Sequence, residues 1–272
     1  MTVEVLATPS AGGVGHVQVT RHGDGASRHA LSDVVIDEQP VALVYNGLSH
    51  VVMMATPLDL EDLGVGFSLS EGLLHSVAEL RGIEVQHGPL GVSVQLEVSP
   101  RAFARFKDTR RQLAGRTGCG LCGVESLQAF HNALPRPAPG QPHRATVYTA
   151  AIGRAFRALP DLQVLQAQTG GCHAAAWSTP AGQLSLVRED VGRHNALDKL
   201  IGALARAGQD PAHGLAVVSS RASYEMVSKC LRAGIPGLAA ISAPTTLAVR
   251  IAQQGGLSLY GFCRNGSAVQ YA

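Results

Sequence analysis

The sequence predicts an α/β fold in which a mixed sheet with flanking helices follows a β-rich N-terminal part. Hydrophobic residues make up 46% of the 272 residues, which is enough to bury the core of one large domain or two smaller ones. The second half alternates short β-prone runs with amphipathic stretches, as in a layered α/β structure. The first half consists mainly of short β-prone runs separated by turn residues.

The N-terminal part is expected to begin loosely and then to form strands and a helix. Residues 1–32 are rich in Gly, Ser, Thr and His without apolar periodicity, so we expect a weakly ordered segment there. Asn46-Gly47 lies between two β-prone runs and predicts a hairpin. An acidic first turn predicts a helix over residues 60–69, which Gly72 would end. The β-prone runs are residues 34–36, 41–44 and 51–54, with Pro40 interrupting them.

A second strand pair and a basic helix complete the N-terminal part. The strands are expected at residues 83–86 and 92–98, and the helix at residues 103–113. Residues 134–142, LPRPAPGQP, hold four prolines in nine residues and predict a stiff connector. We therefore divide the chain into an N-terminal part over residues 33–133 and an α/β part over residues 143–272.

The α/β part is predicted from a regular alternation of elements. Leu197, Leu200, Ile201, Leu204 and Ala205 recur at helical spacing, and Gly208 follows them as a helix end. The remaining elements have the lengths typical of buried strands and short helices. Strands are expected around residue 184 and at residues 215–219, 238–241 and 257–262, and helices at residues 223–233 and 246–253.

Charge and the absence of targeting signals limit the functional class. The net charge of +2 is far below the basic excess needed for non-specific nucleic-acid binding, so we expect no nucleic-acid partner. The N-terminal residues lack the pattern of an export signal, and no apolar run reaches the ~18 residues that span a bilayer. We expect a cytoplasmic protein with no membrane partner. Its five cysteines then argue against a disulfide framework.

Two cysteines form a CxxC motif, Cys119-Gly120-Leu121-Cys122, flanked by further glycines. We expect a flexible loop that leaves both thiols accessible. Arg110, Arg111 and Arg116 precede the pair and would favour the reactive thiolate. A thiolate can collect one sulfur atom from a persulfide donor, and a neighbouring thiol can release that sulfur by forming a disulfide. The motif therefore predicts a sulfur carrier.

Zinc binding and redox exchange are the alternatives for this motif. A structural zinc site needs a second ligand pair, and the other close combination is Cys172-His173, whose adjacent side chains rarely reach one metal. A thioredoxin-like motif would begin a helix after the first strand of a βαβ unit, whereas this one follows a basic helix in mid-chain. The other histidines show no metal-ligand spacing, so we expect no permanent metal.

Polar clusters follow the predicted strands of the α/β part, at residues 189–194, 219–221, 242–246 and 262–267. Ligands of open α/β sheets bind outside the carboxyl ends of the strands, so these clusters predict a ligand crevice. Gly192 permits close backbone approach. The N–H groups of a helix starting near Asn195, together with Arg193 and Lys199, would favour an anion. We therefore expect a phosphate-bearing ligand.

Several of these residues also have a structural explanation. Asn195 and Asp198 have the residue types of helix caps, which accounts for them as well as ligand contact does. Glu189 and Asp190 can be explained by loop ion pairs with Arg188 or Arg193.

Arg221 and Arg264 are stronger candidates for ligand contact. Each follows a predicted strand directly and has no obvious local partner. His173 and His194 are weaker candidates, because single histidines are more often structural.

A string of eleven residues closely resembles the hallmark of the FdhD family, the formate dehydrogenase accessory sulfurtransferases: Glu189-Asp190-Val191-Gly192-Arg193-His194-Asn195-Ala196-Leu197-Asp198-Lys199. The CxxC motif resembles the cysteine loop of that family. The resemblance extends over roughly residues 33–271 and includes Asn46-Gly47, Thr56-Pro57, Glu71-Gly72, Thr169-Gly170-Gly171, Arg221-Ala222-Ser223, Ser242-Ala243-Pro244 and Gly261-Phe262.

The resemblance implies a function. It implies transfer of persulfide sulfur from a cysteine desulfurase to a molybdenum or tungsten bis-guanine-dinucleotide cofactor, before this cofactor enters formate dehydrogenase. Cys119 would carry the persulfide and Cys122 would assist. The resemblance also implies a homodimer with a cytidine-deaminase-like core that lacks the catalytic zinc. The residues assigned to the cofactor are Phe262, Cys263, Arg264, Asn265, Gly266 and Ser267, to which we add Arg221 and His194.

Two other functions fit part of the pattern. A chaperone could bind and deliver the molybdenum cofactor without moving sulfur. A small zinc module could use the CxxC motif to mediate protein contacts. Only a sulfur carrier requires Cys119 to become a persulfide.

Overall fold

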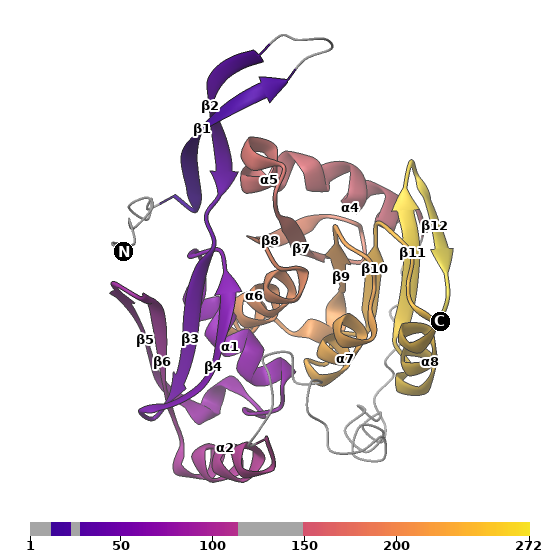
Figure 1. Cartoon of the computed structure of the whole chain (residues 1–272). Coiled ribbons are helices and arrows are strands. Elements are labelled where there is room, and N and C mark those ends of the chain that lie inside the picture. Colours follow the sequence, from indigo (N-terminus) through magenta and orange to yellow (C-terminus); the bar gives the residue numbers. More distant parts are fainter. Residues whose placement is uncertain (1–11, 23–27, 114–148) are drawn as a thin grey trace.

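The computed structural model of the chain describes residues 12–22, 28–113 and 149–272. These residues form a two-stranded ribbon, a four-stranded sheet and a six-stranded sheet, with helices packed between and around the two larger sheets (Figure 1). The predicted class, α/β with mixed sheets and flanking helices, is confirmed. The CxxC loop and the proline-rich connector lie outside the described residues, and the predicted domain boundaries remain predictions.

The four-stranded sheet belongs to the N-terminal part and has the strand order β4-β3-β6-β5. The predicted hairpin is confirmed, and its turn residues Asn46 and Gly47 have φ angles of 45° and 80°, as a tight two-residue turn requires. Pro40 lies inside a strand rather than between two strands. The elements are β3 (Gln39–Tyr45), β4 (Leu48–Ala55), α1 (Leu60–Ser70), η1 (Val77–Glu79), β5 (Leu80–Gly88), β6 (Gly91–Val98) and α2 (Pro100–Leu113).

The six-stranded sheet belongs to the C-terminal part and has the order β12-β11-β10-β9-β7-β8. β9, β10 and β11 are parallel, and β7 pairs antiparallel with both β8 and β9. The carboxyl ends of β8, β9, β10 and β11 therefore meet at one edge of the sheet, as the sequence predicts. The strands are β7 (His173–Ser178), β8 (Leu184–Asp190), β9 (Leu215–Val218), β10 (Gly237–Ala240), β11 (Ser258–Arg264) and β12 (Ser267–Gln270).

Helices cover both faces of the six-stranded sheet. Alternate residues of β9 face opposite sides, so Val218 packs with α6, α7 and α8, whereas Val217 packs with α4. None of the described helices combines the length and the apolar character needed to cross a membrane. The helices are α4 (Thr149–Leu162), α5 (Val164–Thr169), α6 (Arg193–Arg206), η2 (Pro211–His213), α7 (Tyr224–Arg232) and α8 (Thr246–Gly255).

Helix α1 joins the two parts by crossing α6 at backbone contact distance. A Cβ atom built on Gly66 would lie 1.7 Å from the carbonyl oxygen of Asp198. A Cβ atom on Gly202 would lie 1.9 Å from the carbonyl oxygen of Asp62. Only glycine permits this approach, because it has no side chain.

For residues 14–22 and 28–32, the ribbon corrects the prediction of a loose segment, whereas the rest of residues 1–32 lies almost entirely outside the described residues. Strands β1 (Val14–His22) and β2 (Arg28–Ile36) pair antiparallel over nine residues each and stand away from the body of the molecule (Figure 1). Most of their side chains are exposed or partly exposed, so the sequence lacks the apolar alternation that marks a half-buried strand. The sequence patterns also miss α4, α5, β7 and β12; β7 is rich in alanine, which favours strands weakly.

Candidate functional site at the carboxyl edge of the six-stranded sheet

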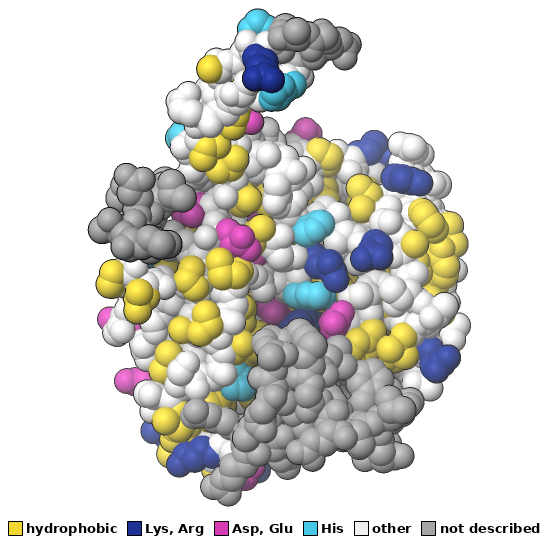
Figure 2. Space-filling model, viewed as in Figure 1, with side chains coloured by type: hydrophobic (Ala, Val, Ile, Leu, Met, Phe, Trp, Pro, Cys, Tyr) yellow, Lys and Arg dark blue, Asp and Glu magenta, His cyan; other side chains and the backbone are white. Residues whose placement is uncertain are grey.

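The structure brings most of the predicted ligand residues to one edge. His194 lies at the start of α6 after β8, Arg221 follows β9, and Phe262 to Ser267 span the end of β11 and the turn into β12. Figure 2 shows histidine and basic side chains gathered in the middle of the visible face, over the region where Figure 1 draws β7 and β9. The predicted crevice residues therefore share one side of the molecule.

Asp190 fixes the geometry of this edge. Its carboxylate lies 2.7 Å from Nζ of Lys199, and both side chains are fully buried. It also accepts hydrogen bonds from the backbone N–H groups of Thr56 and Gly192, at 3.1 and 2.8 Å, and from Nδ2 of Asn195 at 3.0 Å. One buried ion pair thus holds the end of β8, the start of α6 and the end of β4 together.

Glu189 is a second structural carboxylate. It accepts hydrogen bonds from the N–H groups of Leu165 and Gln166, at 2.8 and 2.9 Å, and so holds the start of α5. The Cys172 thiol also donates to it, at 3.3 Å. Burial and the neighbouring Glu189 charge raise the pKa of Cys172 to about 12, so this thiol stays protonated at neutral pH.

The explanation of Glu189 and Asp190 by loop ion pairs with neighbouring arginines is therefore wrong. Arg188 instead pairs with Asp62 of α1 at 2.8 Å, and within the described part of the chain Arg193 forms an ion pair with neither acid. Asp190 takes Lys199 as its partner, nine positions along the chain. The positive charge of Lys199 is neutralised by Asp190, so Lys199 does not contribute to the binding of an anion.

Asn195 and Asp198 are not helix caps. Helix α6 begins at Arg193, with Gly192 as its N-cap, so both residues lie inside it. Asn195 donates to the backbone oxygen of Met54 at 2.8 Å. Asp198 is buried and bonds to partners on two other helices.

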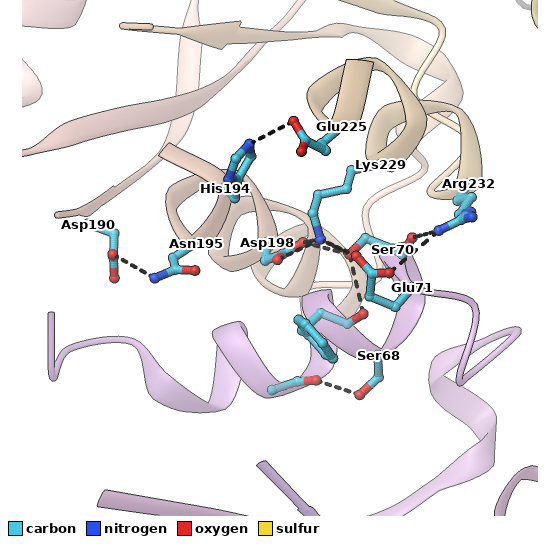
Figure 3. A network of polar contacts seen from close by, with 12 residues as sticks. Ser68, Ser70, Glu71, Asp190, His194, Asn195, Asp198, Glu225, Lys229 and Arg232 are labelled. Atoms are coloured by element: carbon cyan, nitrogen blue, oxygen red, sulfur yellow. Dashed lines mark hydrogen bonds and ion pairs between the residues drawn. The ribbon is translucent and has the colours of Figure 1, made fainter. Parts of the chain in front are cut away.

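The partners of Asp198 form the polar network drawn in Figure 3. Asp198 lies 2.9 Å from Nζ of Lys229 on α7 and accepts a hydrogen bond from Ser70 of α1 at 2.6 Å. Lys229 also pairs with Glu71 at 2.8 Å. Burial alone would lower the pKa of Lys229, but the carboxylates of Asp198 and Glu71 hold it above its ordinary value. This network ties α1, α6 and α7 together and is structural.

Of the residues at the start of α6, Arg193 and His194 are left facing the edge. Nε of Arg193 is buried without a hydrogen-bond partner. Nε2 of His194 lies 3.4 Å from the carboxylate of Glu225 on α7, and Figure 3 shows the two side chains pointing toward each other. The contact with His194 lowers the pKa of Glu225 to about 2. The sequence resembles the FdhD family at Glu225, but sequence reasoning assigned this residue no role, because nothing in its own helix indicates a partner on α6.

Phe262 and Asn265 have strained backbones. Their φ angles are 50° and 53°, a region that side chains other than glycine seldom adopt. For Asn265 the turn into β12 accounts for the angle, whereas for a bulky residue such as Phe262 it marks a genuine outlier. Arg264 is exposed and its guanidinium lies 5.7 Å from the centre of the Phe262 ring. This strained segment is consistent with ligand contact.

The other predicted ligand residues differ in their exposure. Arg221 is exposed, and no described residue forms a hydrogen bond or ion pair with its guanidinium; its backbone oxygen accepts a hydrogen bond from the Ser220 hydroxyl at 3.0 Å. Cys263 is only 1% exposed and burial raises its pKa to about 12, so its side chain faces the core rather than a ligand. Gly266 and Ser267 are exposed at the turn.

The thiols predicted to carry sulfur, Cys119 and Cys122, lie outside the described residues. Within the described ranges, no group of three or more His, Cys, Asp or Glu side chains could hold a metal ion. His173 is half-buried at the start of β7, and burial together with the Arg193 charge lowers its pKa.

Comparisons with known proteins identify the family. The sequence model of the FdhD/NarQ family matches residues 36–272. The chain is 54% identical over 259 residues to the sulfur carrier protein FdhD of Chromobacterium violaceum, covering 95% of both chains. It is 55% identical over 240 residues to the sulfur carrier protein FdhD of Cupriavidus necator, covering 88% of this chain and 82% of the relative.

A solved structure shows the same fold. It is the crystal structure of a protein classed as a formate dehydrogenase accessory protein, from Desulfotalea psychrophila. The TM-score is 0.71 and the sequence identity 22%, with 94% of this chain and 96% of that chain covered. From the family match and the close relatives together, the chain belongs to the FdhD/NarQ family.

Proposed function

We propose that the chain is a sulfurtransferase that carries sulfur for formate dehydrogenase. It accepts persulfide sulfur from a cysteine desulfurase on Cys119 and passes it to a molybdenum or tungsten bis-guanine-dinucleotide cofactor, its bound substrate. Formate dehydrogenase then receives that cofactor. The protein acts in the cytoplasm as a homodimer, and its α/β core is cytidine-deaminase-like.

The observation that carries this proposal is the 54% identity, over 95% of the chain, to a relative named a sulfur carrier protein. The CxxC motif supplies the two thiols that such a carrier needs. The edge of the six-stranded sheet supports a nucleotide-bearing substrate. Arg193, Arg221 and Arg264 lie at that edge, and no described acid forms an ion pair with them.

The sulfur steps balance without an outside oxidant. The Cys119 thiolate attacks the outer sulfur of the donor persulfide; a new S–S bond forms on Cys119, and the donor cysteine leaves as a thiolate. For delivery to the acceptor, the Cys122 thiolate attacks the inner sulfur of the Cys119 persulfide; the persulfide S–S bond breaks, the outer sulfur leaves at the oxidation level of sulfide, and a Cys119–Cys122 disulfide forms. A cellular dithiol must then reduce that disulfide before the next cycle.

Intact-mass spectrometry tests the proposal. The purified protein is incubated with a cysteine desulfurase and cysteine, and we expect a gain of about 32 Da per added sulfur. Cys119→Ala should lose this gain, whereas Cys122→Ala should keep it. Cys172→Ala is the matched control, because the Cys172 thiol is 8% exposed and its pKa is about 12, so its removal should change nothing.

The same samples separate the alternative functions. If the wild-type protein gains no sulfur but binds GDP, the carrier mechanism is wrong and a cofactor-binding chaperone takes its place. Stoichiometric zinc that is lost in a Cys119/Cys122 double variant would instead support a structural zinc module.

A further inference from the structure

The starts of helices α6 and α7 hold a histidine–carboxylate pair to which the sulfur chemistry assigns no role. Both helices begin at the carboxyl edge of the sheet. His194 is the second residue of α6 and Glu225 the second residue of α7, with 3.4 Å between Nε2 and Oε2 (Figure 3). The pair therefore bridges two helix starts beside the proposed nucleotide site.

Glu225 is held as a carboxylate facing the imidazole. The Ser223 hydroxyl donates to Oε2 of Glu225 at 2.9 Å, and the position of Glu225 in the first turn of α7 favours a negative charge. The contact with His194, followed by that with Ser223, outweighs the effect of burial and lowers the pKa of Glu225 to about 2. At neutral pH, Nε2 of His194 thus faces a fixed negative charge.

The other ring nitrogen of His194 is available to a ligand. The side chain is 35% exposed, and no described residue forms a hydrogen bond with Nδ1. An imidazole between two anions can donate to both only when both nitrogens carry protons. An anion bound at the Nδ1 side would therefore favour the imidazolium.

The other charged groups around His194 do not prevent a bound anion from favouring its imidazolium form. The other cations nearby are Arg193 on α6 and His173 on β7; the charges of Arg193 and His194 both act on His173 and lower its pKa, so these groups repel one another when charged. A bound anion compensates that repulsion. Asp190 on β8 is neutralised by Lys199, and Asp198 one turn further along α6 is neutralised by Lys229 of α7. Glu225 is thus the carboxylate that faces His194.

We propose that His194 takes up a proton when a phosphate-bearing nucleotide binds at the carboxyl edge, with Glu225 as the positioning residue that stabilises the imidazolium. The inference rests on the proposed function, which places a guanine dinucleotide at this edge. It makes nucleotide affinity depend on pH. Wherever the free protein holds His194 neutral, affinity falls by up to about tenfold per pH unit, because binding then requires one more proton than the free protein holds.

Isothermal titration calorimetry measures this proton directly. The probe is GDP-mannose, whose diphosphate is esterified at both ends and does not titrate near neutral pH. Titrations at pH 7.5 in two buffers of different ionisation enthalpy give the number of protons taken up. We expect uptake approaching one proton for the wild type, none for His194→Asn, and a reduced value with weaker binding for Glu225→Gln.

Two controls make the assignment specific. His213 and Asp210 form another histidine–carboxylate pair, 3.1 Å apart and exposed, so Asp210→Asn should change neither affinity nor proton uptake. His173→Asn should keep the uptake of the wild type. An NMR titration of the His194 ring in the wild-type protein, with and without nucleotide, should show a higher histidine pKa in the complex and needs no substitution.

The outcomes separate this inference from the proposed function. If GDP-mannose binds without proton uptake, or if His173→Asn abolishes the uptake while His194→Asn keeps it, the inference is overturned and the nucleotide site stands. If neither GDP-mannose nor GDP binds, the nucleotide site fails, and the inference fails with it.

Discussion

Replacing Gly66 with alanine should break the contact between α1 and α6. The new Cβ would lie 1.7 Å from the Asp198 carbonyl oxygen and 2.7 Å from the Gly202 nitrogen. Reaching an ordinary contact requires the helices to separate by roughly 1.5–2 Å, since non-bonded atoms prefer about 3.5 Å. Backbone atoms cannot rotate away as a side chain can.

The cost follows from what the helix crossing holds in place. Overpacking alone costs about 1–3 kcal/mol. Separation also stretches the bond from Ser70 to Asp198, a hydrogen bond to a charged group worth about 1.5–3 kcal/mol. Alanine is more favourable than glycine inside a helix by about 1 kcal/mol, which offsets part of this loss. The net loss is about 1.5–5 kcal/mol, and the middle of this range should lower Tm by roughly 10 °C.

Thermal unfolding followed by circular dichroism measures this loss. Gly153→Ala is the matched control, because Gly153 also lies inside a helix but a Cβ there would meet its nearest atoms at an ordinary 3.5 Å. We expect Gly153→Ala to be neutral or slightly stabilising. Equal Tm values for the two variants would refute the backbone contact between α1 and α6.

Other perturbations test separate parts of the structure. Lys199→Met should lower the free energy of unfolding by about 3–5 kcal/mol, because it leaves the buried Asp190 carboxylate unpaired, and urea denaturation would detect this. Phe262→Gly should weaken GDP binding about tenfold with little change in Tm, since glycine adopts the φ angle of 50° without strain; unchanged affinity in a GDP titration would remove Phe262 from the site. Burial raises the pKa of Cys172, Cys230 and Cys263 to about 12 in the folded protein, above the ordinary value of 9.0. As the pH rises, the unfolded chain therefore loses its thiol protons before the folded protein does. The free energy of unfolding should be unaffected by these thiols below pH 9 and should fall above it by up to about 1.4 kcal/mol per pH unit for each thiol. A triple Cys→Ala variant should show a shallower fall.

Within the α/β part, local patterns predicted the consecutive elements from β8 to β11, although α4, α5, β7 and β12 were missed. The helical spacing from Leu197 to Ala205 and the short apolar runs of β9, β10 and β11 depend on neighbours in the sequence, and the structure confirms them. Because those strands are parallel, the polar residues after them necessarily meet at one edge. The shared position of His194, Arg221 and Phe262 could therefore be predicted.

The roles of the charged residues could not be predicted in the same way. Asp198 and Lys199 have the residue types of a cap and an anion ligand, but their partners Ser70 and Asp190 come from other elements. Sequence spacing does not indicate which distant charge a buried side chain meets. The ribbon of β1 and β2 was missed for the opposite reason: its exposed strands have few buried neighbours to impose a pattern.

The crossing of α1 and α6 also has a consequence for folding during synthesis, because α1 is synthesised well before α6. Ser70 and Asp198, which bond across the crossing, are 128 positions apart. At a synthesis rate of about 5–20 residues per second, the ribosome needs roughly 6–25 seconds to reach α6 after completing α1. During that time the glycine face of α1 has no partner helix to cover it. We therefore expect the nascent N-terminal part to be a client of ribosome-associated chaperones until α6 emerges and docks.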